Sequence, residues 1–496
     1  MSAVSSIEKV GDLRRIADSF RVDVVFQDGS KNDPNMVMSC FIALNLLPRF
    51  LKMVRYKGDT GILGNFPPSH TAKINLGNDD SGWKPHVTLV FGKDPVVAQN
   101  RVIYVGSAGW SICLSTKKPC GWDSAANVNR IAAMYAGTLA VGEVFKMLLS
   151  SLNVKSELVD TLEYDLVTHG TTKNHPVIEP KIPSIMHLED LTIVGCGAIG
   201  QALIVALANS TYLSGHITLV DQDKLEPSNE QRYILGYEEK RGQMKVNVAQ
   251  GVLSENNNLL SVTVLPMKYE DAMSAFEYSP LGSEIVASVD NERTRINIQA
   301  AIPRLLWNVW TDVSEGSVRY GVGRHVLDTD LECAACSYFP KEKAPSSQLA
   351  MNAIRTGIPE AELQDRIAKG DVCKPEDVER IAKTHNLVVD GLRGLVGMRL
   401  KEVLHGECGV FSIRMPEKHE TTPAPHAPVM AGTILASQII LSRLPLPEGA
   451  RLVESVAEFE SFSIPSSNCL MRKRKNTSCF CNDPVYVEAY RIKWKK

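Results

Sequence analysis

The feature that most constrains the fold of this chain is a glycine-rich turn placed between an apolar strand and an apolar helix. The strand-like run LTIV begins at Leu191, the turn GCGAIG occupies 195–200, and a helix is expected over Gln201–Asn209. Glycine lets the backbone turn sharply and approach a phosphate group, and the helix N-terminus supplies unpaired N–H groups. The next expected strand, 216–220, ends at Asp221, whose carboxylate suits ribose hydroxyls. The pattern predicts a nucleotide-binding unit built on a parallel sheet.

Strand-like and helical stretches alternate over most of the chain, which is typical of α/β proteins with mainly parallel sheets. Further strands are expected in the C-terminal part at Val262–Leu265, Glu284–Val289 and Leu305–Trp310. The N-terminal part shows a weaker version of the same pattern, with strands at 86–91 and 101–106 and a helix over Asn127–Leu149. The sequence therefore predicts two α/β units in tandem.

Two helical segments indicate that the two units are copies of each other. AGTLAVGEVFKMLL, from Ala136, parallels AGTILASQIILSRL, from Ala431, with Ala-Gly-Thr at the same point of an apolar helix. A chance likeness between two apolar helices is the alternative. Because no glycine-rich phosphate turn accompanies the first segment, we expect the N-terminal unit to be a degenerate, inactive copy. The chain would then be a pseudo-dimer.

Charged and amide side chains follow the expected strands of the C-terminal unit. They are Asp223, Asn229 and Arg232 in DQDKLEPSNEQR, Lys245 in GQMK, and Asp290 with Asn291 after a later strand. The glycine turn alone fits a nicotinamide-dependent dehydrogenase equally well. Hydride transfer needs neither a cationic pair against a triphosphate nor an acid for a divalent metal. Phosphoryl and nucleotidyl transfer needs both, because charge develops on the phosphate groups. The set therefore predicts a site for ATP and Mg²⁺.

From about residue 185 to the C-terminus, the chain resembles the superfamily of ThiF, MoeB and the ubiquitin-activating enzymes. The motifs that carry the resemblance are GCGAIG, DQDKLEPSNEQR, GQMK, VDNERTR and CAAC. The resemblance implies a Rossmann-like adenylation domain whose ATP is held by Gly195, Gly197, Gly200, Asp221, Asn229, Arg232 and Lys245, with magnesium supported by Asp290. Asp223 and Asn291 complete the expected binding set, and Arg232, Lys245 and Asp290 are the expected catalytic groups. Ala198, Glu230 and Tyr233 depart from the usual residues of the superfamily.

On this basis the chain divides into four parts. Residues 1–163 form the inactive adenylation-like domain and 164–190 the linker. Residues 191–345 and 404–496 form the active adenylation domain. Residues 346–403 form a helical insert that leads into a crossover loop.

The cysteines fall into two short motifs that suit a metal. Eleven cysteines are too sparse for a disulfide scaffold. Cys333 and Cys336 form a CxxC, and Cys479 and Cys481 form a CxC. Four thiolates suit a closed, tetrahedral structural Zn²⁺ site. The resembling superfamily has two CxxC pairs, so the CxC is a departure, and free thiols or an incidental disulfide are the alternatives.

A thioester-forming cysteine is a separate expectation. In the superfamily such a nucleophile lies in the crossover segment before a late apolar helix, which is the place of Cys408 in HGECGV. Cys373 in the insert is the second candidate. A chemistry that stops at the adenylate, as in MoeB-like members, would need neither residue.

The leading hypothesis is therefore an enzyme that adenylates the C-terminal carboxylate of a ubiquitin-like protein, forms a thioester on Cys408 and hands the protein to a conjugating enzyme. The length and the C-terminal tail of this chain look similar to those of activating enzymes from bacterial ubiquitin-like conjugation operons, which are often linked to phage defence. Adenylation of a sulfur-carrier protein, an NAD-dependent oxidoreductase and a non-catalytic binding module are the alternatives. A net charge of −2 gives no field that attracts nucleic acid or membrane. A cytoplasmic location is expected, and the repeat is compatible with a homodimer.

Overall fold

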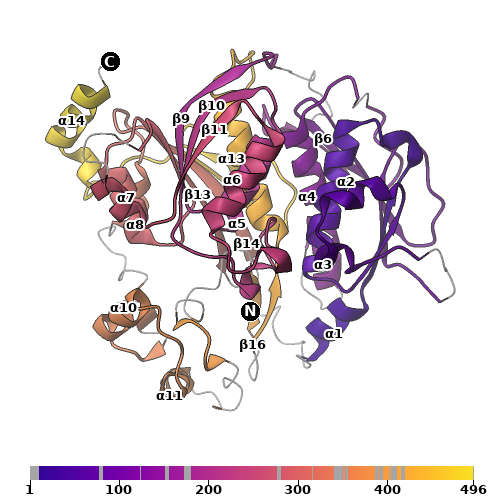
Figure 1. The fold of residues 1–496 in the computed structure, drawn as a ribbon, viewed down its shortest axis with the longest axis horizontal. Coiled ribbons are helices and arrows are strands. Elements are labelled where there is room, and N and C mark those ends of the chain that lie inside the picture. The colour runs from indigo at the N-terminus through magenta and orange to yellow at the C-terminus, as the bar shows by residue number, and fades with distance from the viewer. Residues whose placement is uncertain are drawn as a thin grey trace.

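The computed structural model contains two large sheets with helices between and around them (Figure 1). It describes residues 11–77, 82–122, 125–150, 156–171, 180–275, 281–314, 317–339, 349, 352–353, 356–385, 389, 395–400, 403, 410–414 and 419–494. The expected α/β class is confirmed.

The N-terminal sheet has eight strands in the order β3-β2-β1-β4-β5-β6-β7-β8. The strands are β1 (Arg21–Phe26), β2 (Met53–Lys57), β3 (Ile74–Asn75), β4 (Val87–Phe91), β5 (Arg101–Ala108), β6 (Ser111–Ser115), β7 (Thr161–Asp165) and β8 (Gly170–Thr171). The first five pair in parallel, and β6, β7 and β8 extend the sheet antiparallel. β4 is buried along its whole length, which agrees with its largely apolar sequence VTLVF.

The C-terminal sheet has the order β11-β10-β9-β12-β13-β14-β17-β18. Its strands are β9 (Met186–Val194), β10 (Leu213–Val220), β11 (Leu260–Leu265), β12 (Glu284–Ala287), β13 (Leu305–Ser314), β14 (Ser317–His325), β17 (Val456–Glu460) and β18 (Leu470–Met471). Again the first five are parallel and the last three antiparallel. Strand for strand, the two sheets share their order and their directions.

Four apolar helices fill the space between the sheets. They are α2 (Pro34–Leu46), α4 (Arg130–Ser150), α5 (Ala198–Ala208) and α13 (His426–Leu441). Helix α4 packs against α2 and α13, and α13 packs against α5, so one continuous apolar core joins both halves. By length and composition α4 could cross a membrane, but 94% of its apolar window is buried inside the protein.

The two Ala-Gly-Thr segments occupy matching places in this helical layer. A Cβ added to Gly137 on α4 would lie 2.3 Å from the carbonyl oxygen of Ser39 on α2. A Cβ added to Gly432 on α13 would lie 2.7 Å from the Cβ of Ala202 on α5. In each half, therefore, the glycine allows the long helix to approach the helix that follows the first strand of its sheet.

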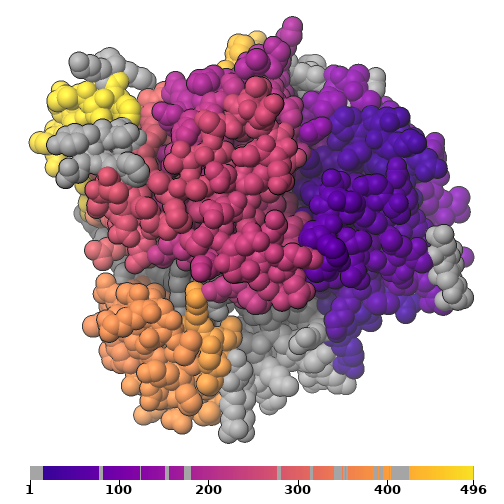
Figure 2. All heavy atoms as spheres, in the orientation of Figure 1, coloured from indigo at the N-terminus to yellow at the C-terminus, as the bar shows by residue number. Residues whose placement is uncertain are grey.

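The remaining elements surround this frame. Helix α6 (Lys245–Asn256) packs beside α5, while α7 (Tyr269–Ala275) and α8 (Glu292–Ala300) share a separate apolar cluster with the C-terminal sheet. The others are α1 (Gly11–Ser19), α3 (Pro68–Thr71), α14 (Pro484–Trp494) and the hairpin β15 (Val410–Arg414) and β16 (His419–Pro423). The insert carries α10 (Glu360–Ala368) and α11 (Pro375–His385), has a small core of its own, and projects from the main body (Figure 2).

Candidate functional site

The glycine turn lies where the order of the C-terminal sheet reverses. β9 has β10 on one side and β12 on the other, and ligands of open α/β sheets bind beyond the carboxyl ends of strands at such a point. Gly195 has a φ of +96°, and a Cβ there would lie 2.7 Å from the carbonyl oxygen of Ser288. A Cβ on Gly200 would lie 2.1 Å from the carbonyl oxygen of Gly195. Both positions therefore require glycine.

Asp221 ties the glycine turn to the end of β10. Its carboxylate accepts hydrogen bonds from the backbone N–H of Cys196 at 2.7 Å and of Asp223 at 2.8 Å. Burial raises the pKa of this carboxyl, and the charge of Lys245 opposes that shift. Gly197, the N-cap of α5, has no side chain that could occupy the first-turn N–H groups of the helix. The turn thus presents backbone amides beside an anchored acid, as phosphate and ribose binding requires.

Tyr233 lies at the centre of the candidate site, although sequence reasoning treated it only as a departure. The Nζ of Lys245 and the guanidinium carbon of Arg232 each lie 5.4 Å from the centre of its ring. Its hydroxyl lies 3.4 Å from the position that a Cβ on Gly197 would occupy. One aromatic ring therefore contacts both cations and faces the glycine turn.

A further charged group, Asp290, influences the ionisation of the Tyr233 phenol. Burial raises the pKa of Tyr233, Lys245 and Arg232 lower it, and Asp221 and Asp290 raise it. Such interactions act over short distances in a protein. Arg232 and Lys245, the latter at the start of α6, thus lie on the Tyr233 ring, and Asp290, which follows β12, is close enough to influence the charge of the phenol. Asp290 itself is exposed to solvent.

Lys245 is held in place at its backbone and at its side chain. Its N–H donates to the carbonyl oxygen of Asp223 at 2.9 Å, and its Nζ lies 2.9 Å from Oδ2 of the same residue. Burial lowers the pKa of the ammonium, but Tyr233, Asp221 and Asp223 raise it, and the net pKa lies above its ordinary value. Lys245 is therefore a permanent, buried cation.

The two expected binding amides serve local structure. The Oδ1 of Asn229 accepts from the backbone N–H of Glu226 at 3.1 Å, and the Oδ1 of Asn291 accepts from that of Thr294 at 3.2 Å as the N-cap of α8. These bonds fix the loops that carry Arg232 and Asp290. Each amide still has its Nδ2 group with which to meet a phosphate oxygen.

Arg295 braces the loop that carries Asp290. Its guanidinium is buried and donates to the carbonyl oxygens of Ala287, Val289 and Val309 and to Oδ1 of Asn308. The carboxyl end of β12 is therefore fixed against β13.

The corresponding position of the N-terminal half is built differently. The side chain of Gln27, after β1, donates to the carbonyl oxygen of Asp94 at 2.8 Å and accepts from its N–H at 2.9 Å, which bridges the ends of β1 and β4. The carboxylate of Asp33 caps α2 by accepting from the N–H groups of Asn35 and Met36. A cavity of about 130 Å³ remains, lined in part by Gln27, Asp33 and Asp94. The amides that bind phosphate in a nucleotide site are thus occupied here by side chains.

The four cysteines of the two short motifs converge. The Sγ of Cys333 lies 3.6 Å from that of Cys479 and 3.8 Å from that of Cys336, and Cys336 lies 3.4 Å from Cys481. All four sulfurs are buried and lie within 4.8 Å of one another. Four sulfurs bound to one Zn²⁺ at about 2.3 Å would be separated by about 3.8 Å, so the cluster fits that ion.

The candidate thioester cysteines differ in what the structure says of them. Cys408 lies outside the described residues. Cys373 is 1% exposed in the core of the insert, and burial raises the pKa of its thiol to about 11. A buried, protonated thiol is a poor nucleophile. Cys196 is also buried within the glycine turn, which agrees with a packing role.

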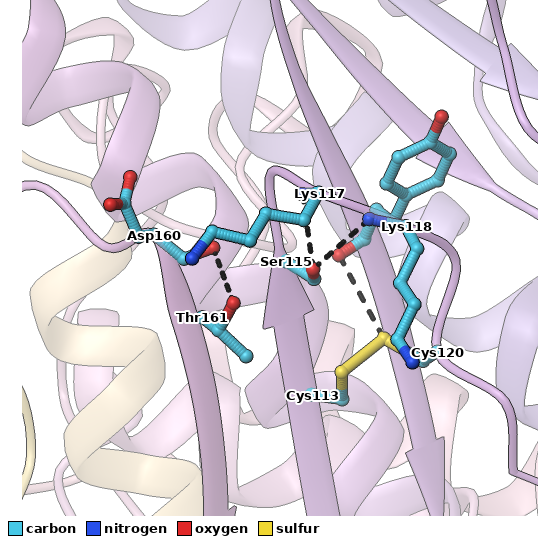
Figure 3. Close-up of a disulfide and its surroundings, with 8 residues drawn as sticks. Cys113, Ser115, Lys117, Lys118, Cys120, Asp160 and Thr161 are labelled. Carbon is cyan, nitrogen blue, oxygen red and sulfur yellow. Dashed lines mark hydrogen bonds between the residues drawn. A yellow bond between two sulfur atoms is a disulfide. The ribbon is translucent and has the colours of Figure 1, made fainter.

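A disulfide joins Cys113 on β6 to Cys120 in the segment that follows (Figure 3). The Oγ of Ser115, at the end of β6, accepts from the backbone N–H groups of Lys117 and Lys118 and so turns the chain back toward the strand. The expectation that cysteines of this chain serve metal or thiol chemistry did not include this pair.

The fold and the site together define a nucleotide-binding α/β enzyme of the adenylating class. Residues 184–481 match the ThiF family, and the chain belongs to that family. The resemblance to the ThiF, MoeB and ubiquitin-activating superfamily is thereby confirmed.

Similar proteins include one bacterial relative and several solved structures. The uncharacterized protein y4jF of Sinorhizobium fredii is 26% identical over 502 residues, which cover 98% of this chain and 93% of the relative. Structures of E. coli MccB with MccA-N7isoASN and with succinimide are 17% and 18% identical, with TM-scores of 0.33 and 0.34. Each match covers 59% of this chain and 66% of the MccB chain, just under two thirds of it. TM-scores of this size are too low to bear on function.

Proposed function

We propose that this chain binds ATP with Mg²⁺ and adenylates the C-terminal carboxylate of a small protein, most specifically a ubiquitin-like one. The observation that supports the proposal is that Arg232 and Lys245 both lie on the ring of Tyr233 at the glycine turn, within the electrostatic influence of Asp290. A peptide C-terminal carboxylate has a reference pKa of about 3.5, so it is already ionised at neutral pH. The site must therefore position it and neutralise charge.

The proposed reaction is a nucleotidyl transfer. A carboxylate oxygen attacks the α-phosphorus of ATP, a mixed acyl–phosphate anhydride forms, and the bond between the α- and β-phosphates breaks to release pyrophosphate. Lys245 and Arg232 stabilise the negative charge that develops on the phosphates. Asp290, which is solvent-exposed beside the turn, would hold Mg²⁺, whose positive charge offsets that of the pyrophosphate. Asp221 and Asp223 would bind the ribose and support Lys245.

The N-terminal half is proposed to be a degenerate copy that makes the chain a pseudo-dimer. The shared strand order and the matching contacts of Gly137 and Gly432 support this proposal. The bridge from Gln27 to Asp94 and the capping of α2 by Asp33 support the loss of nucleotide binding in that half. The same proposal includes the association of two such chains as a homodimer.

A second step is proposed on Cys408. Its thiolate would attack the acyl carbon of the adenylate, form a thioester and release AMP, and a conjugating enzyme would then accept the small protein. The burial of Cys373 favours Cys408 over it. Structural Zn²⁺ at Cys333, Cys336, Cys479 and Cys481, a cytoplasmic location and a role in a bacterial conjugation pathway of antiviral defence belong to this proposal.

ATP–pyrophosphate exchange in the presence of candidate ubiquitin-like proteins tests the first step. The wild type should exchange label only with a partner that has a free C-terminal carboxylate, and Asp290→Asn should lose exchange while it keeps its thermal stability. A wild type that neither exchanges nor shows a thermal shift with ATP and Mg²⁺, but is stabilised by NAD, would replace the proposal with the oxidoreductase alternative. Acyl-adenylate without a reducible enzyme adduct would point to the sulfur-carrier alternative.

A further inference from the structure

The segment 230–237, which carries Arg232 and Tyr233, is held from outside its own half. Arg49 ends the short helix Leu47–Arg49 that follows α2 in the N-terminal half. Its Nη1 donates to the carbonyl oxygens of Glu230 and Gly236, and its Nη2 donates to that of Ile234 at 3.0 Å. Three carbonyls of one loop are therefore fixed by one guanidinium that lies 181 residues away from Glu230 in sequence.

Asn45, on α2, holds the same loop, and the two residues Asn45 and Arg49 are called the clamp below. Its Oδ1 accepts from Nε and Nη2 of Arg49, while its Nδ2 donates to the carbonyl oxygen of Ile234 at 3.1 Å and to the hydroxyl of Tyr237 at 2.8 Å. The guanidinium of Arg49 also lies 5.3 Å from the Tyr237 ring. Both clamp residues are buried, at 9% and 0% exposure. Burial lowers the pKa of Arg49 only to about 10, so it remains charged at neutral pH.

We infer that Arg49, together with Asn45, is a positioning group for the ATP site, supplied by the half that is itself unable to bind nucleotide. The inference rests on the proposed ATP binding. All five N–H donors of the guanidinium are directed at Asn45 and at the loop carbonyls, so none is left to contact ATP. Arg49 acts instead by fixing the backbone from which Arg232 and Tyr233 project toward Gly197 and Lys245.

The opposite side of the loop is fixed within the C-terminal half. The side chain of Gln201 on α5 donates to the carbonyl oxygen of Cys196 and accepts from the N–H of Leu235 at 3.1 Å. The loop is thus held between the glycine turn and the N-terminal half, and removal of Arg49 would leave only the two bonds of Asn45 on the N-terminal side. Small displacements of groups that position a substrate are costly, because binding and catalysis depend on sub-ångström placement.

The test compares Arg49→Met, Arg49→Lys and Arg55→Met in the full chain. Arg55 is a matched control because it is a buried arginine of the same half, bonded to Asp23 on β1. Arg49→Met should weaken binding of ATP with Mg²⁺ by roughly 10- to 100-fold and accelerate hydrogen exchange of the amides of 229–237. Arg49→Lys, which keeps the charge and can reach only part of the carbonyl set, should recover part of both losses. Arg55→Met should lower thermal stability yet leave ATP affinity within about twofold of the wild type.

The inference is overturned if Arg49→Met binds ATP as the wild type does, or if Arg55→Met loses as much affinity. Should Arg49→Met fail to fold, Arg49→Lys and its exchange pattern decide, and unchanged exchange at 229–237 in that variant also overturns it. A wild type that does not bind ATP refutes the proposed function instead, while the exchange measurement still tests the clamp, since it needs no nucleotide.

Discussion

The ammonium of Lys245 lies 5.4 Å from the centre of the Tyr233 ring, on which the guanidinium of Arg232 also lies. A cation above an aromatic face is attracted by the ring quadrupole with about 0.5–2 kcal/mol. One aromatic side chain thereby sets the separation of the two cations that the proposed reaction directs at the phosphates. Tyr233 is one of the positions at which the chain departs from the usual residues of the resembling superfamily.

Replacing Tyr233 therefore tests whether the ring organises the cations. Tyr233→Leu should weaken the binding of ATP with Mg²⁺ by roughly tenfold, since the loss of about 1.4 kcal/mol changes affinity by that factor. Tyr233→Phe keeps the ring and should bind ATP nearly as the wild type does. Titration calorimetry of both variants measures the effect. Equal binding by Tyr233→Leu would show that the cations do not need the ring.

Lys245 is expected to act directly on the phosphates. Lys245→Met should lower the rate of pyrophosphate exchange by about 10²- to 10³-fold, a loss typical of a removed charge-stabilising group. Lys240→Met, at an exposed position just before the start of α6, is the control and should keep the wild-type rate. If both variants exchange equally, Lys245 serves only its ion pair with Asp223.

The cysteine cluster predicts a dependence of stability on zinc. Purified protein should contain about one Zn²⁺ per chain, and the double variant Cys333→Ser/Cys336→Ser should lose it and unfold at least about 5 °C lower. Cys469→Ser is the control, because Cys469 is buried in the main core and not in the cluster. Metal analysis alongside thermal unfolding measures both effects. A native preparation without zinc would refute the assignment.

The parts of the fold that the sequence predicts are those with local causes. The glycines at 195 and 200 are required by the turn itself, and Asp221 follows from the length of one strand–helix–strand unit. The strand runs at 86–91 and 305–310 are apolar because both faces of a parallel sheet are buried. The CxxC and CxC motifs indicate a metal without any tertiary information.

What the sequence could not predict depends on contacts between distant segments. Arg49 binds carbonyl oxygens, which every residue has, so no side-chain pattern marks its partners. In the N-terminal half, the side chain of Gln27 bonds the backbone of Asp94, and a side-chain pattern cannot predict this contact either. The bond from Arg295 to the carbonyl oxygen of Val309 likewise depends on the neighbouring strand β13. The sequence shows that Tyr233 departs from the usual residue of the superfamily, but only the structure shows that Arg232 and Lys245 pack on its ring.

The proposed thioester predicts different outcomes for two cysteines. Cys408→Ala should retain pyrophosphate exchange and lose the enzyme adduct that a reductant or thiol cleaves. Cys373→Ala should keep the adduct, because burial raises the pKa of the Cys373 thiol to about 11 and leaves very little thiolate at neutral pH. Mass spectrometry with and without a thiol distinguishes the two. An adduct that persists in Cys408→Ala and vanishes in Cys373→Ala would transfer the role to the insert.

Buried histidines predict that the free energy of unfolding falls at acidic pH, because they lie in or beside the apolar core that joins the two halves. Burial lowers the pKa of His426 on α13 to about 3, of His70 to about 3 and of His169 to about 4, from an ordinary value of 6.5. Below pH 6.5 these histidines are therefore protonated in the unfolded chain but remain neutral in the folded chain. The stability that these neutral histidines allow is present above pH 6.5 and is lost as pH falls toward 4, by about 1.4 kcal/mol per pH unit for each histidine.

His426 is the best position at which to test this linkage, because it is fully buried at the α4–α13 contact, beside Phe145 and Gly142. His426→Leu has a similar volume and cannot take up a proton. Its free energy of unfolding in urea should fall less steeply between pH 6.5 and 4.5 than that of the wild type. The difference in slope should be about 1.4 kcal/mol per pH unit, the contribution of one buried histidine. If His426→Leu keeps the slope of the wild type, the acid sensitivity arises elsewhere and the contact between α4 and α13 is not its source.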